Sequence, residues 1–386
     1  MKKSQLAIAI TAAMSLSGIS TAQAEDATTL KDALSGSSVK YNFRYRYEMV
    51  DQDGVSEDAG ASTLKSRLTV TSKSYNGFTT QVELDNVSVV GDENHNDTTN
   101  GMGDHAVVAD PESSEINQAW ISYKTGDTEV KAGRQRIVLD NQRFVGGVAW
   151  RQNEQTYDAA TVINKSLPDT TVTYSYIHNV NNIFGKNVDT DTSLFNVKYT
   201  GIKGAALSGY HYAIEHEMDT TGLRLAGKAG SFLYEAEYAT QETHDGGTYE
   251  QDYTHLVVGA KFSGITVKVG QEVLGSDDGM KGFSTVLATK HKFNGWADKF
   301  LGTPNDGLED TYFSIGGKLA GIKLMAVYHE FEGDETGFDY GDELDLVAVK
   351  KLKNGLKLVL KGAFYDQGDS TKGDTDKVWL MAQYAF

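Results

Sequence analysis

The sequence predicts an all-β protein whose strands form a transmembrane, antiparallel, up-and-down β-barrel of 18 strands, with 16 strands as the alternative count. Two patterns predict this fold. Long stretches alternate between apolar and polar residues, and short turns alternate with longer polar connections. Composition agrees, because the 386 residues include 40 glycines and 20 tyrosines but only 39% hydrophobic residues, too few aliphatic side chains for two packed soluble domains.

The start of the chain predicts export from the cytoplasm. A basic beginning and a mostly apolar stretch lead to Ala22-Gln23-Ala24, the small-residue pattern that a signal peptidase cuts. We therefore expect cleavage after Ala24, which removes a signal peptide at 1–24 and leaves a short periplasmic segment at 25–37 before the barrel at 38–386. Thr29 is expected to cap one helical turn in the short segment.

Residues 39–49 carry the clearest strand pattern. Odd positions, from Val39 to Met49, are apolar or aromatic, and even positions, from Lys40 to Glu48, are polar. Only an extended strand with two different faces has this period of two, and eleven residues suit a tilted strand that crosses a bilayer. The stretch that ends in Phe386 repeats the pattern and resembles the last strand of bacterial outer-membrane barrels, which implies recognition by the barrel assembly machinery.

The turn residues predict how the strands are connected. Eight short turns carry residues that favour tight hairpins, at Asn76-Gly77, Thr125-Gly126, Pro168-Asp169, Lys203-Gly204, Ala229-Gly230, Ser263-Gly264, Ala320-Gly321 and Asn354-Gly355. Nine longer connections alternate with them, at 50–62, 88–115, 136–153, 180–191, 215–217, 241–251, 275–308, 333–341 and 367–375. This asymmetry is typical of barrels in the outer membrane of Gram-negative bacteria, which have short periplasmic turns and longer extracellular loops.

The polar faces of the strands predict the chemistry of the lumen. If the apolar face contacts lipid, the opposite face turns inward and carries more basic than acidic residues. The expected pore-lining cations on these faces are Arg44, Arg46, Lys65, Arg67, Lys131 and Arg224. A basic lumen between low-dielectric walls attracts small anionic solutes. The alternative is a web of internal salt bridges that stiffens the barrel wall.

Acidic residues are concentrated in the long connections, at 51–58, 92–115 and 334–342. At the level of the lipid headgroups, such loops would bind divalent cations and bridge to lipopolysaccharide phosphates. Plain solvation of the acidic side chains is the alternative. Outer-membrane lipid and lipopolysaccharide are therefore expected partners.

Composition and motif spacing argue against several functions. A formal net charge of −17 disfavours nucleic-acid binding, and the absence of cysteine rules out disulfides and cysteine–zinc sites. The nine histidines show no shared spacing with nucleophiles or carboxylates. We therefore expect no catalytic residues, no cofactor and no dedicated metal site, and the protein is not expected to be an enzyme.

Two motifs resemble the alginate export porin family. The first spans residues 133–160 and includes Gly133-Arg134-Gln135-Arg136, Arg143-Phe144 and Trp150-Arg151-Gln152-Asn153; the second lies within 283–310 and includes His291 to Asp298. The resemblance implies an outer-membrane barrel that passes anionic polyuronates. It also implies that four arginines line or support an anion-selective constriction, namely Arg134, Arg136, Arg143 and Arg151. This chain has fewer arginines and shorter loops than dedicated alginate exporters.

The connection at 275–308 is too long for an idle loop. It combines basic and aromatic residues, and the candidate constriction residues are Lys290, Lys292, Trp296 and Lys299. The spacing of Trp296 and Phe300 predicts a short amphipathic helix over 295–301. The segment either folds into the mouth of the barrel or lies across its rim.

The predicted function is passive, anion-favouring diffusion of small solutes or short acidic oligosaccharides through an outer-membrane channel. Dedicated translocation of alginate or another polyuronate is the alternative, and a structural barrel with a closed lumen is the third hypothesis. The sequence leaves open the natural solute and the oligomeric state.

Overall fold

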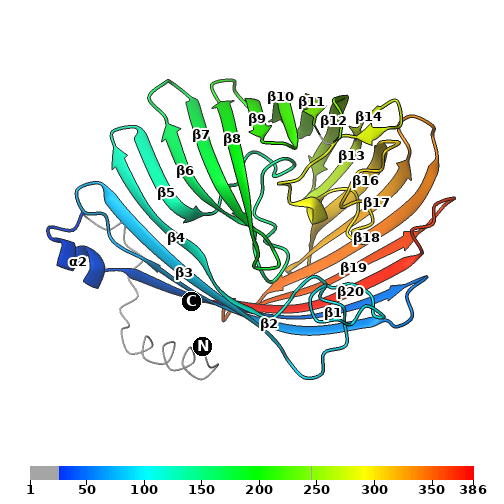
Figure 1. Cartoon of the computed structure of the whole chain (residues 1–386), viewed down its shortest axis with the longest axis horizontal. Coiled ribbons are helices and arrows are strands. Elements are labelled where there is room, and N and C mark those ends of the chain that lie inside the picture. Colours follow the sequence, from blue (N-terminus) through cyan, green and yellow to red (C-terminus); the bar gives the residue numbers. More distant parts are fainter. Residues whose placement is uncertain (1–25, 245) are drawn as a thin grey trace.

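The structure, a computed structural model, describes residues 26–244 and 246–386. The predicted signal peptide lies outside these residues. An 18-stranded antiparallel sheet closes into a barrel (Figure 1), because β1 (Ser38–Gln52) pairs with both β2 (Ala59–Thr71) and the last strand, β20 (Thr375–Ala385). The predicted all-β class and the count of 18 strands are confirmed, and the alternative of 16 strands is wrong.

The other wall strands follow in chain order, and each pairs with its sequence neighbours. They are β3 (Phe78–Val89), β4 (Ser113–Thr125), β5 (Thr128–Gln135), β6 (Thr156–Asn164), β7 (Thr170–Asn181), β8 (Asn187–Tyr199), β9 (Ala205–Ile214), β10 (Met218–Ala229), β11 (Phe232–Thr243), β12 (Tyr249–Phe262), β13 (Ile265–Leu274), β16 (Leu308–Leu319), β17 (Ile322–Glu332), β18 (Asp339–Lys351) and β19 (Lys357–Asp366). This order is the up-and-down topology that the alternating turns predict.

The eight predicted tight turns all lie at one end of the barrel, which we call the short-turn end, and the longer connections lie at the other, the long-loop end. Several of the long connections are shorter than predicted. The connection between β1 and β2 covers 53–58, that between β7 and β8 covers 182–186, and β11 and β12 reach Thr243 and Tyr249, because the strands on both sides continue their pairing further toward the long-loop end.

The two faces of the strands divide as the alternation in β1 predicts. Arg44, Arg46 and Glu48 are buried inside the barrel, whereas Tyr45 and Met49 are each 38% exposed on the outer surface. Exposed aromatic side chains continue around the outside, at Phe78, Tyr123, Tyr174, Tyr176, Phe195, Tyr199, Tyr238, Phe262, Phe313, Tyr328 and Tyr384. An apolar and aromatic exterior is what a lipid environment requires.

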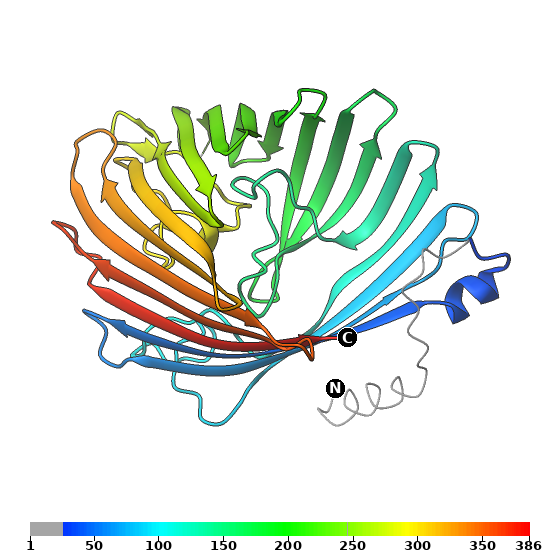
Figure 2. The ribbon, with the colours of Figure 1, turned by 180° about the vertical axis from the view of Figure 1, so that it is seen from behind.

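One short helix, α2 (Leu30–Ser35), precedes the barrel and lies outside its wall (Figure 2). The side chain of Thr29 accepts a hydrogen bond from the Asp32 backbone N–H, so the predicted cap is confirmed. The helix is held at the short-turn end, where the Lys73 N–H donates to the Ala33 carbonyl. Among the described residues, no helix has the length and apolar character needed to cross a bilayer.

Two long connections fold into the barrel instead of standing above it (Figure 1), at 136–155 and 275–307. We call them the inner loops. The second contains a small hairpin, β14 (Ser276–Asp277) with β15 (Lys281–Gly282), and one 3-10 turn, η1 (Lys290–Lys292). The segment at 275–307 therefore folds into the mouth of the barrel and does not lie across its rim.

The amphipathic helix predicted over 295–301 is absent from the described segment. Asn294, Gly295 and Asp298 all have positive φ, at 52°, 80° and 64°, and a right-handed helix requires negative values. The spacing of Trp296 and Phe300 therefore has another cause: the two rings occupy separate sites on the barrel wall.

Candidate pore constriction

The two inner loops bind each other inside the barrel. The Gly146 N–H donates to the Leu287 carbonyl at 2.9 Å, and the Thr289 N–H donates to the Gln142 carbonyl at 3.1 Å. Phe144 packs among Tyr210, Tyr253 and Phe283, with ring centroids 5.2 to 5.8 Å apart. Backbone hydrogen bonds and an aromatic cluster thus join segments about 140 residues apart into one constriction.

Arg44 and Arg46 on β1 hold the first inner loop against the wall. Arg44 donates to the Gln152 side chain at 2.8 Å, to the Ala149 carbonyl at 2.9 Å and to the Arg151 carbonyl. Arg46 donates to the Trp150 carbonyl, lies over the Trp150 ring and pairs with Asp110 at 2.8 Å. Both guanidiniums are buried, so their partners compensate the loss of hydration.

A second anchor surrounds Glu154, near the end of the first inner loop. Its carboxylate forms salt bridges with Arg67, at 2.7 Å, and with Arg136. The ammonium group of Lys65 lies 3.8 Å away. Arg67 also forms a two-pronged contact with Asp85, at 2.5 and 2.7 Å. Burial alone raises the pKa of Glu154, but Arg67, Lys65 and Arg136 outweigh it and hold that pKa below its usual value.

The remaining inward arginines are also paired. Arg143 contacts Glu272 at 2.8 Å and donates to Asn294 at 2.9 Å. Arg151 lies 2.9 Å from Asp298 and 3.3 Å from Glu48. Arg224 pairs at 2.8 Å with Glu235. The predicted lumen arginines other than Arg134 are therefore inside the barrel. They are bound to carboxylates or carbonyls, as in the alternative of a web of internal salt bridges that stiffens the wall.

Arg134 is a correction, because its side chain is on the outer face. It shares a face of β5 with Val130, which is 41% exposed on the outside, and strand alternation separates it from inward-facing Lys131. Arg134 forms a two-pronged contact with Asp158 at 2.8 Å, so this aspartate is outside as well. Lys131 itself lies inside, 4.5 Å from the Trp120 ring centroid.

The second inner loop is attached to β18 and β19 through a cage of aromatic rings. The ammonium group of Lys361 lies 3.7 Å from the ring centroid of Trp296, 4.1 Å from that of Trp150 and 5.0 Å from that of Trp379. It also lies 2.6 Å from Nε2 of His291, which stacks on Trp150. Cation–π contacts of this kind are strongest where water is excluded.

His291 joins this cage to the first inner loop. Its Nδ1 is 2.7 Å from Asp298, which also pairs with Arg151. Burial lowers the pKa of His291 to about 3, so the ring is neutral, and we assign the proton to Nδ1, which donates to Asp298 while Nε2 accepts from Lys361. Burial raises the pKa of Asp298, but the contact with His291 and the charges of Lys377 and Arg151 hold it well below its usual value.

The four candidate constriction residues of 275–308 have different contacts: one is fixed to the barrel wall, one joins the two inner loops, and two line a cavity. The Trp296 N–H donates to Glu343 on β18, as does the Ala297 N–H at 2.8 Å, so this part of the loop is fixed to the wall. Lys292 donates to the Asn141 carbonyl at 2.6 Å and joins the two inner loops. Lys299 donates to the Thr375 hydroxyl at 2.6 Å, while Lys290 and Lys299 both face a cavity at the long-loop end.

This cavity, which we call the outer vestibule, has a volume of about 640 Å³. Its charged lining residues are mostly basic, namely Arg151, Lys290, Lys299, Lys372, Lys377 and Asp298. Burial lowers the pKa of Lys299 to about 8, and the neighbouring Lys377 and Lys372 add to this effect. Such a set of crowded cations favours a bound or passing anion, which would relieve their mutual repulsion.

The lumen also carries basic residues at the short-turn end. By strand alternation, several lysines face inward near this opening, among them Lys40, Lys261, Lys268, Lys318, Lys323 and Lys357. None of these six has a carboxylate within 4.0 Å among residues 26–244 and 246–386. Unpaired lysines therefore lie at both openings, while the arginines between them are neutralised.

Sequence reasoning missed some of the carboxylates that neutralise the arginines. Asp110 was expected among the exposed acidic loops, yet it is fully buried beside Arg46. Glu154, Asp298 and Glu343 were not expected in the lumen at all. The only signal for them was indirect, since many inward arginines imply buried partners.

One group of side chains has the composition of a metal site. Ligand atoms of Glu235, Glu237 and His255 lie within 4.8 Å of one another inside the barrel. Arg224 already contacts both glutamates, at 2.8 and 3.4 Å. Its guanidinium supplies the positive charge that a metal ion would bring, so we assign this cluster to the salt-bridge network.

A closed 18-stranded barrel with an apolar exterior, a charged lumen and inward-folded loops defines an outer-membrane channel of the porin type. The alginate export family model matches residues 36–270, which is more than half of the chain. The chain therefore belongs to the alginate export family, and the match covers the first of the two motifs, at 133–160.

Solved structures agree on the fold. Acinetobacter baumannii OccAB2 is similar with a TM-score of 0.73 and 14% identity, over 92% of this chain and 99% of that one. Pseudomonas aeruginosa OccD3 (OpdP) has a TM-score of 0.69 and 14% identity, over 91% of each chain. P. aeruginosa OpdK with vanillate has a TM-score of 0.69 and 13% identity, over 90% of this chain and 98% of that one. A search of curated sequences finds no match. These relatives are channels and not enzymes.

Proposed function

We propose that this porin-like channel conducts small anionic solutes, including short acidic oligosaccharides, passively and in preference to cations. The observation that carries the proposal is the outer vestibule, where Lys290, Lys299 and Lys372 have no carboxylate within 4.0 Å among the described residues, while Asp298 already pairs with Arg151. The unpaired lysines at the short-turn opening give the solute a second basic region on leaving. Because the arginines between the two regions are paired, selectivity depends on the lysines.

The comparisons support an anionic substrate at a coarser level. The family model concerns alginate export, and alginate is a polyanion. One similar structure is described with vanillate, a small carboxylate. We further propose that the long-loop end faces outward, that the exposed acidic loops bind divalent cations at lipopolysaccharide, and that β20 is recognised by the assembly machinery.

Reversal potentials in planar bilayers under a salt gradient test the proposal. The wild-type channel is expected to favour chloride over potassium, and Lys299→Gln with Lys372→Gln should reduce this preference by about two-fold, since salt screens part of each charge. Arg134→Gln is the control: it removes one cation from the outer face of β5, where the test variant removes two from the vestibule, and it should leave selectivity unchanged.

The other hypotheses have separate outcomes in the same experiment. Cation preference in the wild type would overturn the proposal, and an absence of conductance would favour a structural barrel with a closed lumen. Block of the single-channel current by polyuronate at low concentration would favour dedicated polymer translocation, which the family match makes the second candidate function.

A further inference from the structure

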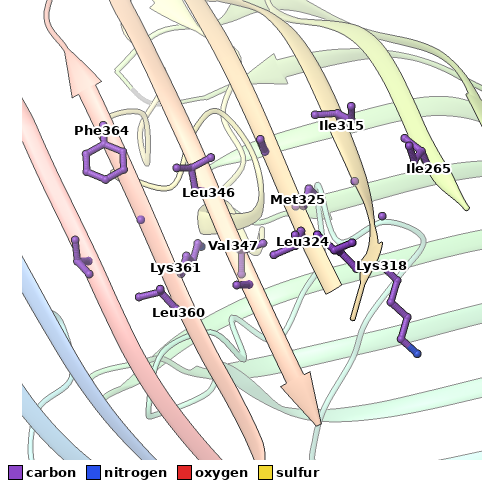
Figure 3. Close-up of a pocket in the computed structure, with 17 residues that line it drawn as sticks. Ile265, Ile315, Lys318, Leu324, Met325, Leu346, Val347, Leu360, Lys361 and Phe364 are labelled. Carbon is purple, nitrogen blue, oxygen red and sulfur yellow. The ribbon is translucent and has the colours of Figure 1, made fainter. Parts of the chain in front are cut away.

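Four lysines form a row along the short-turn edge of the lumen, across four consecutive strands of the wall. The members of this lysine row are Lys318 on β16, Lys323 on β17, Lys351 on β18 and Lys357 on β19. The outward positions of the same strands are apolar, as Figure 3 shows for Leu324, Leu346 and Leu360. In the same view, the Lys318 amine extends away from these side chains. Strand alternation therefore places the whole lysine row on the inner face.

The strand register sets these lysines opposite each other in two pairs. Lys318 is the partner of Lys323 between β16 and β17, and Lys351 is the partner of Lys357 between β18 and β19. Directly opposed side chains have Cβ atoms about 4.5–5.5 Å apart, and like charges in such positions repel each other. Because Lys323 pairs with Val349, it is also a diagonal neighbour of Lys351, so the two pairs adjoin.

No group of the described chain balances these charges. Within residues 26–244 and 246–386, none of the four ammonium groups has a hydrogen-bond acceptor or a carboxylate in contact. The outward Lys350, by contrast, donates to the Ala320 carbonyl at 2.9 Å. Along β16 and β18, the nearest inward carboxylates are Asp310 and Asp345, eight and six residues from the lysine row. The backbone register therefore holds like charges together beside a low-dielectric wall, and an anion from the solution would relieve their repulsion.

The arrangement of the lysine row selects both the charge and the length of a ligand. Each pair is able to place two ammonium groups on one carboxylate, since every ammonium group carries three N–H donors. Two strand spacings separate the pairs, with an offset of two residues along β18, so their centres lie about 10–12 Å apart. A small monoanion reaches only one pair, whereas an elongated molecule with a carboxylate at each end reaches both.

We propose that the lysine row binds an elongated dicarboxylate, with one carboxylate at the Lys318–Lys323 pair and the other at the Lys351–Lys357 pair. The inference rests on the proposed function, because it names the charge and shape of the anion that the lumen takes at its short-turn opening. Binding at the lysine row does not require the ligand to cross the constriction.

Isothermal titration calorimetry of the purified full-length barrel at low ionic strength tests the proposal. The probes are suberate, a linear dicarboxylate, and its monoamide, which has the same length but one charge. Suberate is expected to bind about ten-fold more tightly, because its second carboxylate reaches the second pair. Lys318→Gln with Lys323→Gln, and separately Lys351→Gln with Lys357→Gln, should reduce this ratio to about two, the statistical advantage of two equal ends.

The matched control is Lys261→Gln with Lys268→Gln. It removes two inward lysines from the same opening, but their strand partners are Thr266 and Gly259, so they do not oppose each other. This control should weaken both ligands and retain most of the ten-fold ratio. A ratio that falls as far in the control as in the two test variants would attribute the preference to the general charge of the opening and overturn the proposal.

Two other results would overturn the proposal. A ratio near two in the wild type would show that the lysine row is merely hydrated. A ratio that is lost in Lys299→Gln with Lys372→Gln would place the dicarboxylate in the outer vestibule instead. Calorimetry requires no conductance, so its outcome is separate from that of the reversal potentials: an anion-selective channel without the ten-fold ratio keeps the proposed function and loses only this inference.

Discussion

The charged side chains of the lumen divide by residue type. Arginines are buried and each has several partners, as Arg46 illustrates with Asp110 and the Trp150 carbonyl. Most lysines at the two openings have no carboxylate partner; Lys377, which lies 3.4 Å from Asp298, is an exception. The planar guanidinium makes several directed hydrogen bonds at once and suits a structural anchor, whereas the more hydrated ammonium remains available to a passing ion.

The lowered pKa of Lys299 predicts a pH dependence of selectivity. Because burial and the neighbouring Lys377 and Lys372 bring this pKa to about 8, Lys299 is charged at pH 7 and loses its proton between pH 7 and 9. Anion preference should therefore decrease over this range, well below the ordinary titration of lysine near 10.5. Reversal potentials measured at pH 7, 8 and 9 provide the check.

Lys299→Arg is the informative control for this titration, since arginine stays charged throughout the range. The variant should keep its anion preference at pH 9. A wild-type channel whose selectivity stays constant from pH 7 to 9 would show that Lys299 does not contribute to the selectivity of the channel.

At the scale of the elements, strands and inner loops differ in how far the sequence predicts them. Alternation along β1 and residues such as Asn76-Gly77 are local signals, so strands, turns and faces follow from neighbours in the sequence. The path of an inner loop depends on contacts such as Arg143 with Asn294, which are 151 residues apart. No local pattern encodes them, and the helix expected over 295–301 fails because Glu343 binds the backbone there.

Acidification is expected to loosen the second inner loop. His291 has a pKa of about 3 in place and about 6.5 when the loop is detached and solvated, so the detached state binds more protons between these values. Attachment therefore weakens as pH falls below 6.5, by at most about 1.4 kcal/mol per pH unit. Asp298, whose pKa is also lowered, adds to the loss only near pH 4 and below.

Hydrogen exchange of residues 286–301 as a function of pH measures this attachment. Exchange corrected for its intrinsic pH dependence should rise from pH 6.5 to 4.5 in the wild type. His291→Asn keeps a side-chain donor for Asp298 but does not titrate in this range, so its corrected exchange should stay constant. Equal pH dependence in both proteins would exclude His291 as the cause.

At the scale of the whole molecule, closure depends on the pairing of the first and last strands. β1 and β20 pair over eleven positions, from Asn42 with Ala385 to Gln52 with Thr375. Beyond the last pair, the Tyr41 N–H donates to the Phe386 carbonyl, and the Phe386 ring stacks on Tyr41 at 5.3 Å. The sequence predicts this seam because both strands alternate and the strand number is even.

Phe386→Ala should lower the temperature at which the purified, folded barrel unfolds. The substitution removes ring contacts with Tyr41, Phe43 and Tyr384, each worth about 0.5–1.5 kcal/mol beyond the area that they bury. The shift from folded to unfolded mobility in electrophoresis after graded heating measures the effect.

Phe232→Ala is the control, since this exposed aromatic also lies beside a short turn but has no aromatic ring partner in the described chain. It should unfold close to the wild-type temperature. If Phe386→Ala does too, the terminal ring matters for biogenesis alone and not for the stability of the seam.

The anchors of the inner loops come from opposite ends of the chain. Arg44 and Arg46 are on β1, whereas Glu343, Lys361 and Trp379 are on β18, β19 and β20. The contacts that hold the second inner loop to Glu343, Lys361 and Trp379 are complete only after these final strands have formed. The constriction is therefore fully anchored only in a barrel whose first and last strands have paired, so gating and closure depend on the same seam.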